Sequence, residues 1–438
     1  MDYSSKIVSL EEALAQVKSG DVIVTGLGAA EAGAFMGQLH TVAERGVKDV
    51  IVTNCLPTHP SRIYDPEYAD VFTVEGWFYA PALRKAHSQG NMSFIPNHLH
   101  LAAIKRLYHR KPDIFVGTAT MPDKHGYVSL SLSNTYEKRM IEQAKMVILE
   151  INPNMPYTLG DVQMPAWEAD YLVKVDYMPP ETPDAPFSEK DQIIGQYIAD
   201  MVDDGSCIQL GIGGIPNAVA AKLDTKNDLG VHTEMMTTNM MRLAKMGVIN
   251  GKCKQAEKGK IVATFAMGTQ ELYEYMDYNP SIAIMDGAWV NDPYTIARND
   301  NMVSINTSLE VDLTGQCASE SLGSKQFSGT GGQADTAIGA QMSKNGKSII
   351  ALYSTALVKQ PDGTRKEVSK IVPQLMPGAT VSLSRMDVDR VVTEYGVAEL
   401  RGTSLRERVE KLINIAHPKF RDELWDQAVE VGIIGKRR

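Results

Sequence analysis

Short apolar runs rich in β-branched residues alternate with amphipathic helical segments along the chain, and this alternation limits the possible folds most. The runs are bounded by glycine, proline or charged residues: Val22–Val24, Val50–Thr53, Ile114–Val116, Met146–Leu149, Ile261–Phe265, Ile349–Tyr353 and Val391–Thr393. Continuous apolar runs are typical of strands buried on both faces, as in a parallel sheet covered by helices. The pattern predicts α/β domains with mainly parallel sheets.

One pattern occurs in both halves of the chain. The capping box Ser9–Glu12 opens a helix that we expect to end near Gly20, and Gly20–Gly28 then reads as a strand followed by Gly-x-Gly. In the second half, a helix with apolar positions across Ile194–Val202 precedes Gly205–Gly213, which reads the same way. The equal spacing favours a duplicated α/β domain, with chance convergence of two ordinary helix–strand units as the alternative.

A proline-rich segment lies between the two halves. Met178–Pro186 contains four prolines and lacks an apolar period, which is typical of an extended linker. A chain of 438 residues is also longer than a single core of ordinary size requires. We therefore predict two domains, residues 1–183 and residues 184–438.

Composition excludes several classes of partner. The formal charge of −9 argues against nucleic-acid binding, which depends largely on Lys and Arg. No apolar run approaches the ~18–20 residues of a membrane span, and no signal peptide is evident at the N-terminus. The four cysteines are far apart and form no CxxC pair, which predicts neither a metal site nor a disulfide framework: Cys55, Cys207, Cys253 and Cys317. A reduced, cytoplasmic location is the simplest expectation.

Two glycine-rich turns are candidate ligand-binding loops. Gly211–Val219 follows a strand and leads into an Ala-rich helix, with Pro216 suited to a first helical turn. Glycines allow close approach of a ligand, and the N–H groups at a helix start attract anions. Phe327–Asp335 is a second such turn, whose successive N–H groups could form an oxyanion hole. Taken singly, each turn is explained as well by a structural role.

A short strand ends in Glu234 within Leu229–Met236. Most glutamates at strand ends are solvated and inert, so Glu234 alone is only a weak catalytic candidate. His232 is better explained as a packed or hydrogen-bonded histidine than as a base. The sequence contains neither an HExxH motif nor a Ser-His-Asp order. The turns at Pro122–Gly126, Asn152–Pro156 and Glu394–Gly396 are better explained by structure than by function.

Read together, the segments resemble the acetyl-CoA hydrolase/transferase family, close to its 4-hydroxybutyrate CoA-transferases and butyryl-CoA:acetate CoA-transferases. The matching segments run in family order: Glu75–Phe78, Pro122–Gly126, Glu150–Pro156, Gly211–Val219, His232–Met235, Lys325–Asp335, Val392–Gly402 and Ile415–Arg421. The resemblance implies two pseudo-symmetric CoA-transferase-type domains of the NagB/RpiA-like α/β fold, the second carrying the catalytic glutamate.

The resemblance also assigns roles to residues. Glu234 matches the glutamate that becomes a glutamyl-CoA thioester. The CoA-binding residues implied are those of the two turns: Gly211, Ile212, Gly213, Gly214, Ile215, Gly331, Gly332 and Gln333. Relatives commonly read Ser-Glu-Met-x-Ser-Asp-Gly at the glutamate, whereas Thr233–Asn239 here reads Thr-Glu-Met-Met-Thr-Thr-Asn. The glutamate is kept, but the residues that follow it differ and lack the aspartate of the family pattern.

The implied activity is that of an acyl-CoA:carboxylate CoA-transferase of the EC 2.8.3 type, acting on acetate, butyrate or 4-hydroxybutyrate. CoA would be a co-substrate, with no other cofactor and no metal. One alternative is a hydrolase that uses the same glutamate. Another is a sugar-phosphate isomerase or a ligand-binding regulator on a related scaffold. A homodimer or homotetramer is expected, and neither a nucleic-acid nor a membrane partner.

Overall fold

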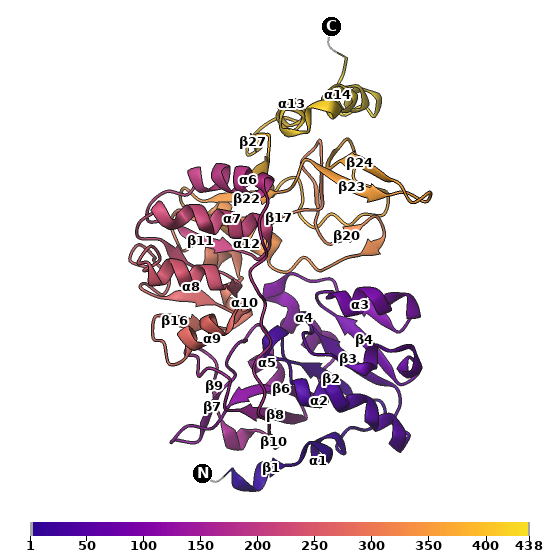
Figure 1. The fold of residues 1–438 in the computed structure, drawn as a ribbon, viewed down its shortest axis with the longest axis vertical. Coiled ribbons are helices and arrows are strands. Elements are labelled where there is room, and N and C mark those ends of the chain that lie inside the picture. Colours follow the sequence, from indigo (N-terminus) through magenta and orange to yellow (C-terminus); the bar gives the residue numbers. More distant parts are fainter. Residues whose placement is uncertain (1–2, 437–438) are drawn as a thin grey trace. The chain divides into compact units, whose positions relative to one another are not determined.

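The computed structural model describes residues 3–436, which belong to two compact units (Figure 1). The first unit contains Met1–Pro183, His232–Met241 and Lys260–Asp292, and the second contains Asp184–Val231, Arg242–Gly259 and Pro293–Arg438. The predicted domains assign His232–Met241 and Lys260–Asp292 to residues 184–438, whereas both segments pack in the first unit. Glu234 lies in one of those segments and therefore belongs to the first unit, whereas we expected it in the C-terminal domain.

An eight-stranded sheet forms the centre of the first unit, and all of its neighbouring strands are parallel. In spatial order the strands are β1 (Ile7–Val8), β10 (Tyr171–Lys174), β8 (Met146–Asn152), β6 (Ile114–Thr120), β2 (Val22–Thr25), β3 (Val50–Asn54), β4 (Phe72–Gly76) and β5 (Met92–Phe94). Every residue of β2 and β6 is buried, which explains why these strands read as continuous apolar or small-residue runs.

Helices and small sheets complete the first unit. Its helices are α1 (Leu10–Leu14), α2 (Gly33–Gln38), α3 (Pro81–Ala86), α4 (Ala102–His109), α5 (Glu137–Ile141), α9 (Gln270–Met276) and α10 (Gly287–Val290). Three two-stranded sheets pair β7 (Tyr127–Ser129) with β9 (Gln163–Pro165), β13 (Met235–Met236) with β15 (Phe265–Ala266), and β14 (Ile261–Ala263) with β16 (Ile282–Ile284). One hydrophobic cluster packs Phe35, Met36 and Leu39 against β2, β3 and β4.

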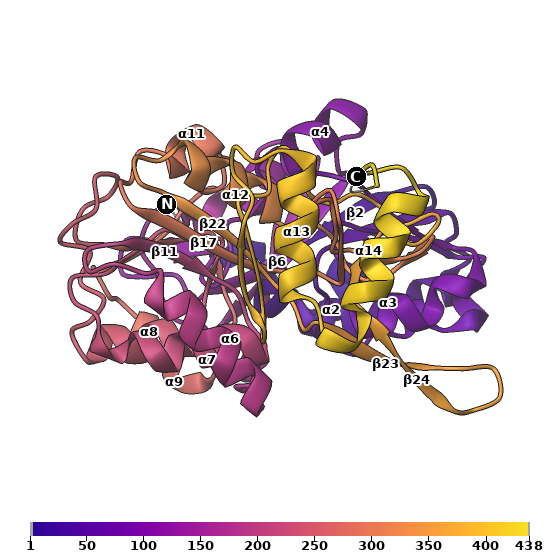
Figure 2. The ribbon, with the colours of Figure 1, turned by 90° about the horizontal axis from the view of Figure 1, so that it is seen from above.

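A six-stranded sheet forms the centre of the second unit. Its order is β12 (Gly230–Val231), β11 (Cys207–Leu210), β17 (Met302–Thr307), β22 (Lys347–Ala351), β26 (Arg390–Thr393) and β27 (Gly396–Glu399). Only the last pair is antiparallel. Figure 2 shows α6 (Glu189–Asp200) and α7 (Gly214–Lys222) on one face of this sheet, and α11 (Pro293–Ile296) and α12 (Gln333–Met342) on the other. The prediction of α/β units with mainly parallel sheets is confirmed.

Further elements extend the second unit. Helices α13 (Leu405–Ile415) and α14 (Arg421–Glu430) are the last two helices of the described residues, while α8 (Thr238–Lys245) begins in the first unit and ends in the second. The small strands are β18 (Glu310–Asp312), β19 (Cys317–Ala318), β20 (Ser321–Leu322), β21 (Lys325–Gln326), β23 (Thr355–Lys359), β24 (Arg365–Ser369) and β25 (Ile371–Val372). Within residues 3–436, no helix combines the length and apolar character that crossing a bilayer would need.

The expected capping box is present and a second one occurs before α6, but the first helix is shorter than expected. Ser9 and Glu12 cap α1 reciprocally, and Ser188 and Asp191 do the same for α6. The expected helix to Gly20 instead ends at Leu14. The chain leaves the helix through tight turns, because the N–H of Val17 donates to Leu14 O at 3.2 Å and the side chain of Val17 enters the core.

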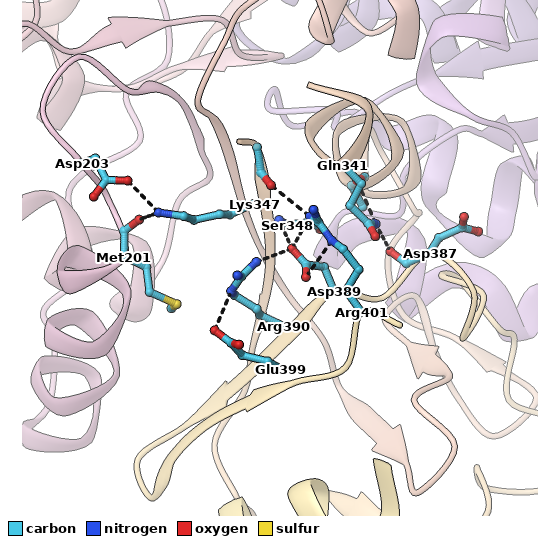
Figure 3. Close-up of polar contacts among 12 residues, drawn as sticks. Met201, Asp203, Gln341, Lys347, Ser348, Asp387, Asp389, Arg390, Glu399 and Arg401 are labelled. Atoms are coloured by element: carbon cyan, nitrogen blue, oxygen red, sulfur yellow. Dashed lines mark hydrogen bonds and ion pairs between the residues drawn. The ribbon is translucent and has the colours of Figure 1, made fainter. Parts of the chain in front are cut away.

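A buried carboxylate joins three segments at the amino-terminal edge of the second sheet (Figure 3). Asp389 is 1% exposed and accepts hydrogen bonds from the backbone N–H of Ser348 at 2.9 Å and from Arg390 at 2.6 Å. Arg401 binds both of its oxygens, at 3.1 and 2.7 Å, and also donates to Gly346 O. Asp389 therefore ties β22, β26 and the segment after β27 together.

We predict that Asp389→Ala lowers the free energy of unfolding by about 3 kcal/mol, because it leaves the partly buried guanidinium group of Arg390 and the buried N–H of Ser348 without their acceptor. Urea unfolding of purified protein measures the loss. Glu399→Ala is the matched control, since Glu399 pairs with Arg390 from an exposed position and such pairs contribute little. Equal effects of the two substitutions would contradict this account of Asp389.

Candidate active site

The backbone around Glu234 is fixed within the first unit by hydrogen bonds to the segment before β15. Glu234 O accepts from the N–H groups of Thr264 and Phe265, both at 2.9 Å, and β13 then pairs with β15 in parallel. Two residues earlier, His232 forms a parallel β-bridge with Val262. These contacts also explain why the predicted run Ile261–Phe265 is divided into two short strands, since Thr264 turns its N–H toward Glu234.

An asparagine holds the Glu234 side chain. Asn291 Nδ2 donates to Glu234 Oε2 at 3.2 Å, and Asn291 is 1% exposed. Asn291 follows α10, and the last carbonyl of α10, Val290 O, lies 2.7 Å from His232 Nε2. The buried His232 ring also packs against Trp289. His232 is therefore a packed, hydrogen-bonded histidine, as predicted, and it fixes the helix end that presents Asn291.

Sequence reasoning missed Asn291. It stands 57 residues beyond Glu234 (291 − 234), within a helix-to-turn connection before Pro293. No motif links the two positions, and an asparagine after a helix is common in ordinary turns. Only the pairing of β13 with β15 and the position of α10 reveal the contact.

Two carboxyl groups, those of Glu234 and Glu137, act on the buried thiol of Cys55. Cys55 is buried, and burial raises the pKa of its thiol, with further increases from the negative charges of Glu137 and Glu234. Glu137 is itself buried, and this burial raises its pKa although the N–H groups of Leu27 and Tyr136 both donate to it at 2.9 Å. Cys55 therefore stays an uncharged thiol under the influence of these two carboxyl groups.

The residues that differ from the family pattern after Glu234 are packed at the start of α8. Thr238 Oγ1 accepts from the N–H of Thr269 at 3.0 Å, and Thr237 Oγ1 accepts from the N–H of Met240 at 3.4 Å. Both threonines are buried. The two hydroxyl groups thus fix the helix start, which is a structural role for this part of the departure.

The first glycine turn, Gly211–Ile215, joins β11 to α7 in the second unit. Gly213 is the residue before α7 and has φ 121°, a conformation that other residues rarely adopt. Gly214 lies against the carboxylate of Asp191, where a Cβ would approach Oδ2 to 2.9 Å. Asp191 is buried and also accepts from Tyr353 OH at 2.6 Å. Glycine is therefore required at both positions.

The second glycine turn leads into α12 in the same unit. Gly331 has φ 55°, Gly332 is the N-cap residue, and the side chain of the buried Gln333 donates to Thr307 O at 2.8 Å. Thr307 is the last residue of β17. The helix start is thereby held at the carboxyl end of that strand.

A polar network brings the two turns to one edge of the second sheet. Gln209, on β11, contacts Asn306 of β17 at 3.4 Å, and Asn306 donates to Thr336 of α12 at 3.1 Å. Since β11 and β17 are adjacent and parallel, their carboxyl ends meet at this edge. The two turns that contain the eight residues predicted to bind CoA thus lie at the same sheet edge. Glu234 belongs to the other unit, and its predicted position between the turns stays a prediction.

The other turns have structural partners. The pKa of Glu394 is lowered: burial opposes ionisation, but Ser354 N–H at 2.9 Å, Ser354 Oγ at 2.8 Å and Lys190 Nζ at 3.0 Å outweigh it. Asp123 accepts from the N–H groups of His125 and Tyr127 within its own turn. Residues 3–436 contain no cluster of three or more His, Cys, Asp or Glu side chains suited to holding a metal ion.

Comparison with known proteins identifies the family. The acetyl-CoA hydrolase/transferase N-terminal domain matches residues 1–181, and the C-terminal domain of the same family matches residues 268–428. The chain belongs to the acetyl-CoA hydrolase/transferase family. The resemblance predicted from the sequence is confirmed.

Similar proteins share nearly the full length of the chain. The chain is 42% identical to succinyl-CoA:cyclohexane-1-carboxylate CoA transferase of Geobacter metallireducens, over 98% of the chain and 96% of that protein. It is 44% identical to 4-hydroxybutyrate coenzyme A transferase of Clostridium kluyveri, over 81% and 82%. The crystal structure of RipA from Yersinia pestis matches with TM-score 0.88 at 35% identity, over 99% of both chains. The predicted enzyme class agrees with the Geobacter and Clostridium proteins, which are named CoA transferases.

A buried carboxylate in the first unit makes the stability of this family member depend on pH. Glu150 is fully buried, and burial raises its pKa above the usual 4.5, although Phe35 N–H at 2.6 Å and Tyr177 OH at 2.6 Å donate to it. The folded state therefore holds this proton more tightly than the unfolded state. Its contribution to stability falls as pH rises from about 4.5 through the raised pKa.

We predict that the unfolding free energy of Glu150→Gln minus that of wild type increases as pH is raised from 5 to 8, because the amide has no proton to lose. Urea midpoints at four pH values measure this difference. Glu142→Gln, at an exposed position of the same unit, should show a smaller trend. A difference for Glu150→Gln that does not change with pH would contradict the prediction.

Proposed function

We propose that this protein transfers CoA from an acyl-CoA to a free short-chain carboxylate, of the acetate, butyrate or 4-hydroxybutyrate type, with Glu234 as the covalent carrier. The proposal is supported by the CoA transferases among its relatives. The observation that carries the choice of residue is the Asn291–Glu234 hydrogen bond, which orients one carboxylate oxygen on a strand fixed by two backbone bonds.

The proposed reaction proceeds in two reversible halves. A Glu234 carboxylate oxygen attacks the acyl-CoA carbonyl carbon and the C–S bond breaks. CoA thiolate is released, and the acyl group is joined to Glu234 as a mixed anhydride. The thiolate then attacks the Glu234 carbonyl carbon, the anhydride C–O bond breaks, and the first acid departs from a glutamyl-CoA thioester. An incoming carboxylate reverses both steps. This is covalent catalysis with ping-pong kinetics.

Asn291 has a distinct task in this scheme. When the thiolate attacks Glu234, negative charge develops on a carboxyl oxygen of the glutamate. The Nδ2 group that already donates to Oε2 can stabilise that charge without reorganisation. A neutral amide donor orients the carboxylate with less loss of nucleophilicity than a cationic donor in the same place would cause.

CoA is the proposed co-substrate, and no further cofactor is proposed. The two thioesters exchanged are nearly equal in energy, so the reaction requires no ATP and no redox group. The two glycine turns, held at one sheet edge, are the proposed contacts for CoA, where N–H groups at helix starts suit its phosphates and carbonyls. A homodimer or homotetramer in the cytoplasm stays a prediction.

Hydrolysis of acyl-CoA by the same glutamate is the alternative, since the family contains both activities by its description. The two differ in the final acceptor, which is water for the hydrolase. CoA release from acetyl-CoA that does not depend on added carboxylate would favour the hydrolase. Formation of a new acyl-CoA only when a second acid is added would favour the transferase.

We predict that incubation with acyl-CoA in the absence of an acceptor leaves CoA attached to a peptide containing Glu234, measured by intact-protein and peptide mass spectrometry. Glu234→Ala should lose the adduct and reduce transfer below one tenth of wild type. Glu142→Ala is the matched control and should keep both. Normal turnover without an adduct, or a Glu234→Ala enzyme above one tenth of wild-type activity, would refute the proposed carrier.

We also predict that Asn291→Ala lowers kcat by roughly 100-fold, in the range reported for removal of one oxyanion donor. Steady-state assays at saturating substrates measure this, with near-native urea stability as the check on folding. The control Asn154→Ala removes a partly exposed amide that bonds Asp176, and should keep kcat within twofold. A loss confined to KM for Asn291→Ala would show that the amide binds substrate without stabilising the transition state.

A further inference from the structure

Three adjacent strands of the first sheet end beside one another, and the residues that follow them form a wall. Strands β2, β3 and β4 are parallel neighbours, so their carboxyl ends lie at the same edge. Gly28 N–H donates to Cys55 O at 3.2 Å, and Trp77 N–H donates to Asn54 O at 3.0 Å. The backbone thus places Gly28, Cys55 and Trp77 next to each other.

The Trp77 indole is buried in this wall without a partner for its N–H. Trp77 is 4% exposed, and its ring packs against Tyr136 with ring centroids 4.6 Å apart. Tyr136 is anchored by its own hydroxyl, which donates to Thr25 O at 2.9 Å. Within residues 3–436, Trp77 Nε1 has no hydrogen-bond partner. Buried indole N–H groups normally have an acceptor, so this one calls for an explanation.

The same wall borders the segment that carries Glu234. A Cβ on Gly28 would lie 3.1 Å from Met267 Sδ, and Met267 directly follows β15, the partner of the strand after Glu234. Charge effects agree with this geometry, since Glu234 and Glu137 both act on the Cys55 thiol. Trp77, Tyr136 and Cys55 therefore lie on the side of the first unit where the glutamate is presented.

Backbone strain also occurs at this edge. Leu56, the residue after Cys55, has φ 51°, which is unusual for a residue with a branched side chain. Its N–H is directed to Phe78 O, one residue beyond Trp77, at 3.5 Å. Strained residues persist where the surrounding structure imposes them, often next to binding sites. The strain lies between the two turns that carry Cys55 and Trp77.

The chemistry of the wall indicates what it would accept. The charges that act on the Cys55 thiol are those of Glu137 and Glu234. A second carboxylate on the substrate would be repelled there. A neutral hydroxyl group would not, and it can supply the oxygen that the indole N–H lacks.

We propose that Trp77 determines acyl specificity, its indole N–H donating to a hydroxyl oxygen near the far end of the acyl chain, so that 4-hydroxybutyrate is preferred over butyrate and succinate. This proposal rests on the proposed CoA transfer and names its substrate class. A site built to hydrogen-bond a substrate hydroxyl group discriminates strongly against the analogue that lacks it, because a buried polar group is then left unpaired.

The test compares kcat/KM for 4-hydroxybutyrate, butyrate and succinate as acceptors from acetyl-CoA. We expect wild type to prefer 4-hydroxybutyrate over butyrate by at least tenfold, and Trp77→Phe to lower that ratio at least tenfold. Trp167→Phe is the matched control: its ring packs against Tyr127, and the ratio should stay within twofold. Replacing Trp77 by 3-benzothienylalanine, which keeps the shape but has sulfur in place of N–H, should repeat the result if Trp77→Phe folds poorly.

The outcomes separate the two proposals. A 4-hydroxybutyrate to butyrate ratio that stays within twofold of wild type in both Trp77 variants would overturn the role of Trp77 while leaving CoA transfer intact. A wild-type preference for succinate or butyrate would also overturn it. No transfer from wild type to any of the three acids would refute the proposed function itself, and this proposal with it.

Discussion

The Glu234 carbonyl, with its two hydrogen bonds from Thr264 and Phe265, is the contact on which the site depends. Gly230 and Val231 form β12 of the second sheet, whereas His232–Met241 belong to the first unit. The chain leaves one unit for the other directly before the glutamate, and a short strand of only two residues, β13, follows it. Such a short pairing has little intrinsic stability. Its position is secured by the buried His232 and by α10, so the packing that fixes the segment also supplies Asn291.

Much of the fold follows from the sequence for a simple physical reason. Strands buried on both faces must be apolar along their whole length, so runs such as Val50–Thr53 and Met146–Leu149 are visible without a structure. The assignment of Lys260–Asp292 to the first unit is not visible in this way. Its strands are two or three residues long, and their partners are chosen by backbone hydrogen bonds and packing, which leave no period in the sequence.

The site was predictable where it depends on the backbone and unpredictable where it depends on a distant side chain. Gly213 and Gly331 have positive φ, and a glycine-rich sequence after a strand signals this directly. Asn291 and Trp77 carry no comparable local signal. Asn291 is defined by its contact with Glu234, which is far away in the chain. Trp77 is defined by the absence, among residues 3–436, of an acceptor for its buried N–H. Both properties exist only once the chain is folded.

The electrostatics around Glu234 suit a carboxylate that has to act as a nucleophile. An arginine or lysine pairing with such a group would stabilise its negative charge and make it less reactive. One hydrogen bond to the glutamate comes from the neutral amide of Asn291, and Glu137 is itself disfavoured as an anion by its burial. Burial of Glu137 therefore limits the repulsion that a second charge would add. Cys55, whose pKa is raised by burial, also stays an uncharged thiol and adds no further negative charge to this group of residues.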